Sequence, residues 1–105
     1  MIARPVTLPI AVPVEFLAEF CQRNQIRKLS LFGSVLTERF RPESDVDVLV
    51  EFETGYTPSL LGMARMEREL GEAFARKVDL RTAEELSRYF RDEVVAGAVA
   101  QYARP

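Results

Sequence analysis

The chain has 105 residues, and its 14 basic side chains against 16 acidic ones give a formal net charge of −2. A chain with this balance lacks the basic face that binding of long nucleic acid requires, so we expect no long nucleic acid partner. No stretch approaches the roughly 20 apolar residues of a membrane span, so we expect no membrane partner. Histidine is absent and there is a single cysteine. This excludes an internal disulfide, histidine-based catalysis and zinc sites built on histidine or cysteine.

Length and composition predict one globular domain over residues 1–105, with an ordinary 48% of hydrophobic and 29% of charged residues. The first 16 residues, MIARPVTLPIAVPVEF, contain no continuous apolar run of the kind found in signal peptides. We therefore expect a cytoplasmic location.

The first third of the chain predicts irregular backbone, then a helix, then a strand. Residues 1–12 are interrupted by prolines. Apolar residues at helical spacing predict a helix from Pro13 to near Gln25. Residues 27–32, RKLSLF, predict a short strand that ends at Gly33-Ser34. A short helix is expected from Val35 to Phe40, and Pro42 would stop it.

The rest of the chain alternates strands and helices. A second strand is predicted over residues 45–52, and Thr57-Pro58 is typical of a helix cap followed by a first helical residue. A third strand is predicted over residues 77–81. Thr82 to Glu85 matches a capping box, which predicts a last helix to about Tyr102 with apolar residues spaced by four. Interleaved elements of this kind indicate an α/β or α+β class, and we expect an α+β fold with a small mixed sheet and helices packed on it.

Two aspartates open the second strand, in the sequence Ser44-Asp45-Val46-Asp47-Val48. Residues i and i+2 of a strand point to the same face, so Asp45 and Asp47 project together, roughly 6.6 Å apart. At an effective dielectric constant of about 20, two such carboxylates repel each other by roughly 2–3 kcal/mol. Solvent exposure would relieve this repulsion, and so would a bound Mg²⁺ or Mn²⁺, which prefer oxygen ligands. The motif alone leaves both explanations open.

Two neighbours make the metal interpretation more specific. Gly33-Ser34 lies between a strand and a short helix, where free amides and a hydroxyl suit a phosphate, although an ordinary turn has the same sequence. Asp79 lies in the third strand and would share the face of Asp45 and Asp47 if the two strands pair. Alternatively, Asp79 is a solvated residue between Lys77 and Arg81. Three carboxylates beside a phosphate-binding turn are typical of two-metal phosphoryl or nucleotidyl transfer.

The block from Leu31 to Val50, LFGSVLTERFRPESDVDVLV, resembles the signature of minimal nucleotidyltransferases of the polymerase-beta-type superfamily. That signature consists of a Gly-Ser turn, a short spacer, Ser-Asp-x-Asp and an apolar strand. The segments KVDL and LSRYFRD and the closing Tyr-Ala are also similar to this family, so the resemblance extends over most of the chain from about residue 13. It implies the polymerase-beta-type nucleotidyltransferase fold.

The resemblance also implies roles for individual residues. Asp45 and Asp47 would bridge two Mg²⁺ ions, with Mn²⁺ as a possible substitute. Asp79 would complete one metal site and help to deprotonate the attacking hydroxyl. Gly33 and Ser34 would hold the β- and γ-phosphates of ATP. Ser44, which opens the Ser-Asp-x-Asp motif, is counted with the nucleotide-binding residues.

The implied reaction is transfer of AMP from ATP to a tyrosine hydroxyl of a HEPN-type toxin, with this chain as the antitoxin of the pair. The chain is too short for the extra domain that holds the acceptor in larger members of the superfamily. We therefore expect an open site that a partner, or a second copy in an oligomer, completes.

Two other hypotheses remain open at this point. Many relatives continue the Gly-Ser turn with arginines, whereas this chain has Val35-Leu36-Thr37-Glu38. That departure favours a weak or inactive binding module that masks a toxin sterically, while the three aspartates favour the enzyme. The third hypothesis is a structural metal-binding or regulatory domain that binds no nucleotide.

Overall fold

The computed structural model describes residues 8–104. Part of the segment predicted to be irregular, residues 1–7, lies outside the described residues, and residues 8–13 contain neither helix nor strand. None of the helices between residues 8 and 104 combines the length and the apolar character that crossing a membrane would require.

Three α-helices, two short 3₁₀ helices and four strands follow one another along the described chain. In order they are α1 (Val14–Arg23), β1 (Ile26–Phe32), η1 (Gly33–Leu36), β2 (Val46–Phe52), α2 (Leu60–Phe74), β3 (Val78–Thr82), η2 (Ala83–Glu85), α3 (Arg91–Gly97) and β4 (Val99–Ala103).

The strands form one mixed sheet in the order β3-β2-β1-β4. β1 runs antiparallel to both β2 and β4, whereas β2 and β3 are parallel. A parallel pair needs a long crossover connection, and α2 provides it. The predicted fold, a small mixed sheet with helices packed on it, is confirmed.

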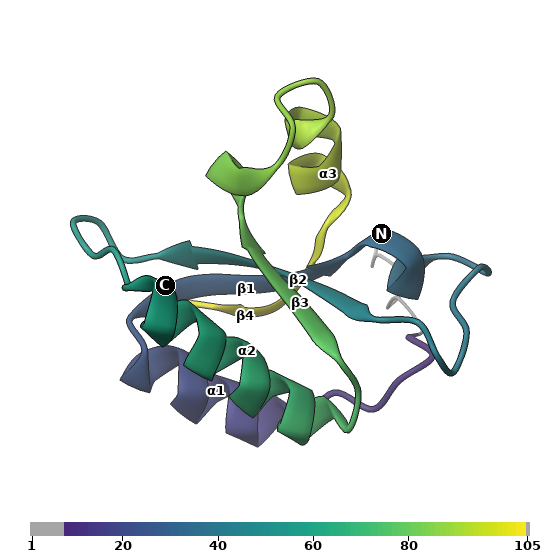
Figure 1. Cartoon of the computed structure of the whole chain (residues 1–105), viewed down its shortest axis with the longest axis horizontal. Coiled ribbons are helices and arrows are strands. Elements are labelled where there is room, and N and C mark those ends of the chain that lie inside the picture. Colours follow the sequence, from purple (N-terminus) through teal and green to yellow (C-terminus); the bar gives the residue numbers. More distant parts are fainter. Residues whose placement is uncertain (1–7, 105) are drawn as a thin grey trace, which may run out of the picture.

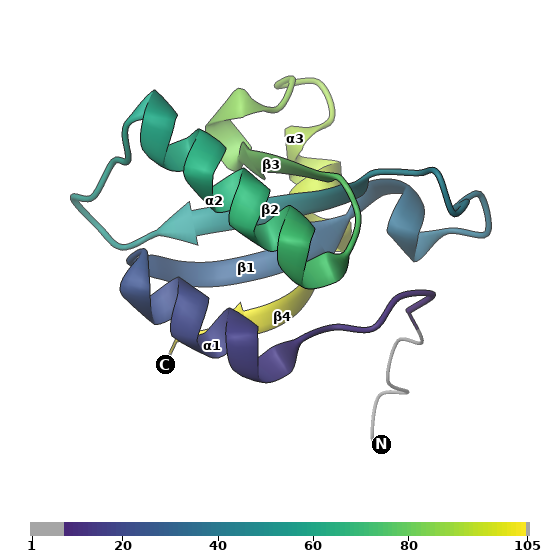
Figure 2. The same cartoon turned by 60° about the horizontal axis from the view of Figure 1, so that its bottom comes forward.

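Helices cover both faces of the sheet. α1 and α2 lie side by side on one face, while η2 and α3 stand on the opposite face (Figures 1 and 2). The buried core lies under α1 and α2 and comprises Leu17, Phe20, Cys21, Ile26, Leu29, Leu31, Val35, Val46, Val48, Val50, Met66, Leu70, Phe74, Val78 and Leu80. Burial raises the pKa of the Cys21 thiol to about 12, which identifies this cysteine as a packing residue.

The prediction of one long last helix is wrong. The capping box forms, because the Thr82 N–H donates to the Glu85 carboxylate at 2.9 Å, but it opens only the three-residue η2. α3 ends at Gly97, and residues 99–103 form β4 along the free side of β1. Apolar residues spaced by four satisfy a helical pattern, but pairing with β1 prevails over that local preference.

Two smaller boundaries also differ from expectation. The α2 cap is Ser59, whose hydroxyl accepts from the Gly62 N–H at 3.0 Å, and not Thr57. The short helix expected from Val35 to Phe40 is the 3₁₀ helix Gly33–Leu36, which begins directly at the Gly-Ser turn. The strands predicted over residues 27–32, 45–52 and 77–81 are each present within one residue at either end.

Gly33 adopts a left-handed backbone conformation, with φ of +76°, immediately after β1. Its neighbour Phe32 pairs with Asp47 across the sheet. A Cβ atom at Gly33 would lie 2.2 Å from Oδ2 of Asp47, so the turn can lie against that carboxylate only if residue 33 lacks a side chain.

Gly33→Ala is therefore expected to lower the free energy of unfolding by about 1–3 kcal/mol, because alanine is strained at positive φ and displaces Asp47. Urea denaturation followed by circular dichroism measures the change. Gly97→Ala is the matched control, because nothing lies within 4 Å of an added Cβ there. An equal effect of the two substitutions would contradict the close approach of the turn to Asp47.

Candidate functional site

Asp47 and Asp79 lie directly opposite each other on the parallel strands β2 and β3. The pair Val46 and Val78 precedes them, and the side chains of this pair are buried in the core. Because strand side chains alternate, the two aspartates point to the other face, the one that carries η2 and α3. The pairing that would bring Asp79 to the face of Asp47 is thus present, with the strand axes about 4.8 Å apart.

The Asp47 carboxyl is partly buried and lies close to other negative charges. Burial raises its pKa above the usual value of 3.8, and the negative charges of Asp79 and Asp45 raise it further. The positive charge of Arg81 acts in the opposite direction. A cation placed between Asp47 and Asp79 would remove the repulsion.

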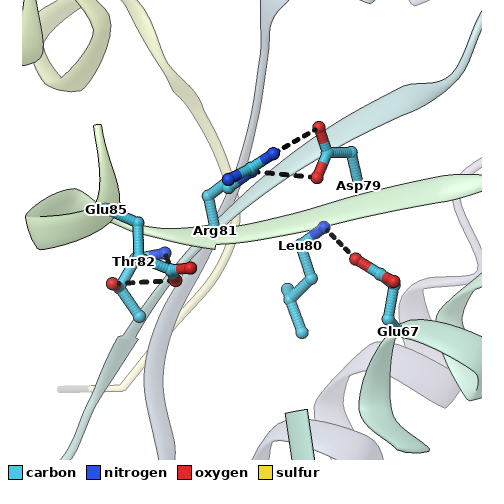
Figure 3. A network of polar contacts seen from close by, with 6 residues as sticks. All are labelled: Glu67, Asp79, Leu80, Arg81, Thr82 and Glu85. Carbon is cyan, nitrogen blue, oxygen red and sulfur yellow. Dashed lines mark hydrogen bonds and ion pairs between the residues drawn. The ribbon is translucent and has the colours of Figure 1, made fainter. Parts of the chain in front are cut away.

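Asp79 is held by a neighbour on its own strand. Nε of Arg81 lies 3.0 Å from Oδ1 of Asp79, and Nη2 lies 3.5 Å from Oδ2 (Figure 3). The two residues are i and i+2 on β3, so their side chains share a face. Both side chains are more than one-third exposed, which leaves the ion pair accessible to solvent.

Asp45 precedes the first residue of β2 and is half-buried. It lines a groove of about 530 Å³ together with Asp79, Arg81 and residues of α2 that include Leu60 and Met63. The groove follows the outer side of β3, and Asp47 does not line it. The structure therefore brings the predicted aspartates to one region, with Asp45 and Asp79 in the groove and Asp47 beside the Gly-Ser turn.

The turn itself is a compact 3₁₀ helix. The Ser34 carbonyl accepts from both the N–H and the hydroxyl of Thr37, each at 2.9 Å, which closes the turn. Ser44 lies at the far end of the connecting loop, where its hydroxyl accepts from the Arg41 N–H at 3.0 Å. The structure thus places Gly33 against Asp47, whereas Ser44 is engaged in its own loop.

The set of donors fits a magnesium ion that shares its ligands with a nucleotide. Between residues 8 and 104 no three acidic, histidine or cysteine side chains are close enough to hold a metal ion by themselves. Mg²⁺ is commonly bound by one or two carboxylates plus substrate phosphates, and Asp47 and Asp79 supply such a pair. The negative charges of Asp79 and Asp45, which add to burial in raising the pKa of Asp47, would attract a cation to this pair.

Two further residues shape the site, and sequence reasoning did not assign them a role. The carboxylate of Glu67, on α2, accepts from the Leu80 N–H at 2.9 Å and so fastens β3 next to Asp79 (Figure 3). No local pattern identifies Glu67, because the contact joins two elements. The sequence does indicate Arg81, since it follows Asp79 by two residues in a predicted strand and would share the face of that aspartate.

Two curated relatives resemble much of this chain. A protein of Methanocaldococcus jannaschii, provisionally named a protein adenylyltransferase, is 32% identical over 77 residues, which are 73% of this chain and 81% of that protein. The protein adenylyltransferase MntA of Thermococcus cleftensis is 37% identical over 62 residues, or 59% of this chain. The match spans only 61% of the length of the Thermococcus protein.

Solved structures confirm the fold. A toxin–antitoxin complex with AMP-PNP contains a chain that superposes with a TM-score of 0.70 and 19% identity, covering 88% of this chain and 74% of that one. A chain from the complex of a tri-AMPylated HEPN toxin of Shewanella oneidensis with an MNT antitoxin superposes with a TM-score of 0.62 and 20% identity. The match covers 86% of this chain and 69% of that one. At these identities the likeness concerns the fold, which is the expected polymerase-beta-type nucleotidyltransferase fold.

A family model described as the nucleotidyltransferase domain matches residues 14–100, which include every element from α1 to the start of β4. The matched range contains the Gly33 turn and all three aspartates. This chain therefore belongs to the nucleotidyltransferase domain family.

Proposed function

We propose that this chain transfers AMP from ATP to a hydroxyl of a partner protein with the help of Mg²⁺. The observation that carries the proposal is the direct opposition of Asp47 and Asp79, with the glycine turn lying against Asp47. Membership of the family supports nucleotidyl transfer, and the protein adenylyltransferase names of two relatives support AMP and a protein acceptor.

Each residue of the site has a part in the proposed reaction. Asp47 and Asp79, with Asp45 beside them, hold the metal, and the backbone of Gly33 and Ser34 binds the β- and γ-phosphates. When bound, Mg²⁺ neutralises the negative charge that develops on the phosphate oxygens. The acceptor oxygen forms a bond to the α-phosphorus, the bond to the bridging oxygen of the β-phosphate breaks, and pyrophosphate leaves. Asp79 takes the proton of the acceptor hydroxyl.

A HEPN-type toxin is the partner that the related structures favour. One related chain is seen in a toxin–antitoxin complex with AMP-PNP, and another with an AMPylated HEPN toxin. The groove at Asp45 and Asp79 is also lined by Leu60, which is 89% exposed and suits contact with a protein rather than with a small molecule. We therefore place the acceptor hydroxyl in this groove.

Steric masking of a toxin without catalysis is the second candidate. The turn segment from Gly33 to Glu38 contains no lysine or arginine, so the turn binds phosphate through amides and a hydroxyl alone. If this weakens nucleotide binding enough, the fold would act only as a cover for its partner. The two functions differ in whether the partner becomes labelled.

Asp47→Asn and Asp79→Asn should each lower label transfer from ATP to the partner by at least about a hundredfold, because even residues that only support metal ligands contribute 10- to 100-fold. The assay combines α-labelled ATP, Mg²⁺ and the purified toxin, with Asp92→Asn on the exposed surface of α3 as the control. If the wild type and both variants left the toxin unlabelled, and both variants still inhibited it, the result would support masking and contradict the proposed enzyme.

Asp47→Asn should also stabilise the protein when no metal is present. The pKa of Asp47 is raised in the folded state, so the folded protein binds the proton more tightly than the unfolded chain does. Relative to Asp47→Asn, the wild type should therefore lose free energy of unfolding as the pH rises from below 3.8 through the raised pKa of Asp47. Addition of Mn²⁺ should restore the lost stability. Urea denaturation across this pH range measures the difference. If Asp47→Asn were less stable than the wild type at neutral pH, the charge of Asp47 would not destabilise the metal-free fold and this prediction would be contradicted.

A further inference from the structure

Arg81 places a positive charge close to the two opposed aspartates, Asp47 and Asp79. It lies two residues after Asp79 on the same face of β3, and its strand partner on β2 is Leu49, two residues after Asp47. Its guanidinium donates to the Asp79 carboxylate, and its charge acts on the Asp47 carboxyl as well. Arg81 therefore lies within electrostatic reach of both aspartates that oppose each other across the strands.

The ion pair with Asp79 is easily exchanged. The Arg81 side chain is 45% exposed and that of Asp79 is 38% exposed, and exposed ion pairs contribute little net stability. A divalent ion attracts a carboxylate more strongly than a single guanidinium charge does. Binding of Mg²⁺ to Asp79 would therefore release the guanidinium without a large cost.

A released guanidinium would remain on the face of the sheet that carries Asp47 and Asp79, because Arg81 lies two residues after Asp79 on β3. Arg81 is fixed at its backbone by β3, whose outward amides at Leu80 and Thr82 are bonded to Glu67 and Glu85 (Figure 3). The fork of N–H donors in arginine matches phosphate oxygens in a bidentate manner. The turn from Gly33 to Glu38 has no basic residue, so a triphosphate bound there has a negative charge that the turn leaves uncompensated.

We propose that Arg81 is an exchangeable counter-ion: it pairs with Asp79 in the metal-free protein and turns to the triphosphate when a divalent ion takes that carboxylate. This inference rests on the proposed function and adds a phosphate-binding residue to it. It requires that removal of the guanidinium has opposite effects on the two ligands. The free metal should bind more tightly, because its competitor is gone, and the metal–nucleotide complex should bind more weakly.

Arg81→Gln should therefore bind Mn²⁺ alone about threefold more tightly than the wild type, as expected for loss of an exposed ion pair. Free Mn²⁺ is counted by electron paramagnetic resonance. The same variant should bind the Mn²⁺ complex of α,β-methylene-ATP, which cannot release pyrophosphate, about tenfold more weakly by calorimetry. Arg81→Lys keeps the charge but not the fork, and it should bind this complex with intermediate affinity.

Arg65→Gln, which removes an exposed arginine of α2, is the matched control and should change neither affinity. Weaker binding of both ligands by Arg81→Gln would show that Arg81 only supports the strand and would overturn the inference. Unchanged affinity for the nucleotide complex in Arg81→Gln would overturn it while leaving the proposed function intact. Failure of the wild type to bind that complex at all would overturn both.

Discussion

The opposition of Asp47 and Asp79 across the parallel strands β2 and β3 is the constraint on which the site depends. Hydrogen bonding of the strands fixes the two backbones about 4.8 Å apart, so the two side chains leave neighbouring points on the same face of the sheet. Burial raises the pKa of Asp47, the negative charges of Asp79 and Asp45 raise it further, and Asp79 forms an ion pair with Arg81. The sheet thus holds two acidic side chains next to each other, and a bound cation would relieve their repulsion.

The same register determines why a glycine follows β1. Phe32 is paired with Asp47, so the next residue passes directly over the carboxylate. Any side chain there would collide with Asp47, and the left-handed φ of the turn is unfavourable for other residues. One glycine therefore satisfies both the turn and the close approach of the backbone to the face that carries Asp47 and Asp79. In the proposed function, phosphate binding at the turn and metal binding at the strands would both follow from this one local arrangement.

Local alternation predicted the strands that carry the site, because each strand has one apolar face in the core. Val46 and Val78 are buried while Asp47 and Asp79 point away, which a period of two is sufficient to indicate. β4 could not be found in this way, since Leu86, Phe90, Val94, Ala98 and Tyr102 also fit a helix and only the free edge of β1 decides between them. The bond from Leu80 to Glu67 likewise depends on how α2 packs against β3, which no single segment encodes.

The free edge of β3 limits how a partner can approach. Its outward N–H groups at Leu80 and Thr82 already donate to the carboxylates of Glu67 and Glu85. A strand added at this edge would have to displace both glutamates, so the edge is protected against pairing with another chain. The groove beside it still exposes Asp45, Asp79 and the apolar surface of Leu60. A protein acceptor of the proposed reaction would therefore gain most by placing side chains in the groove, because this edge of the sheet is closed to strand pairing.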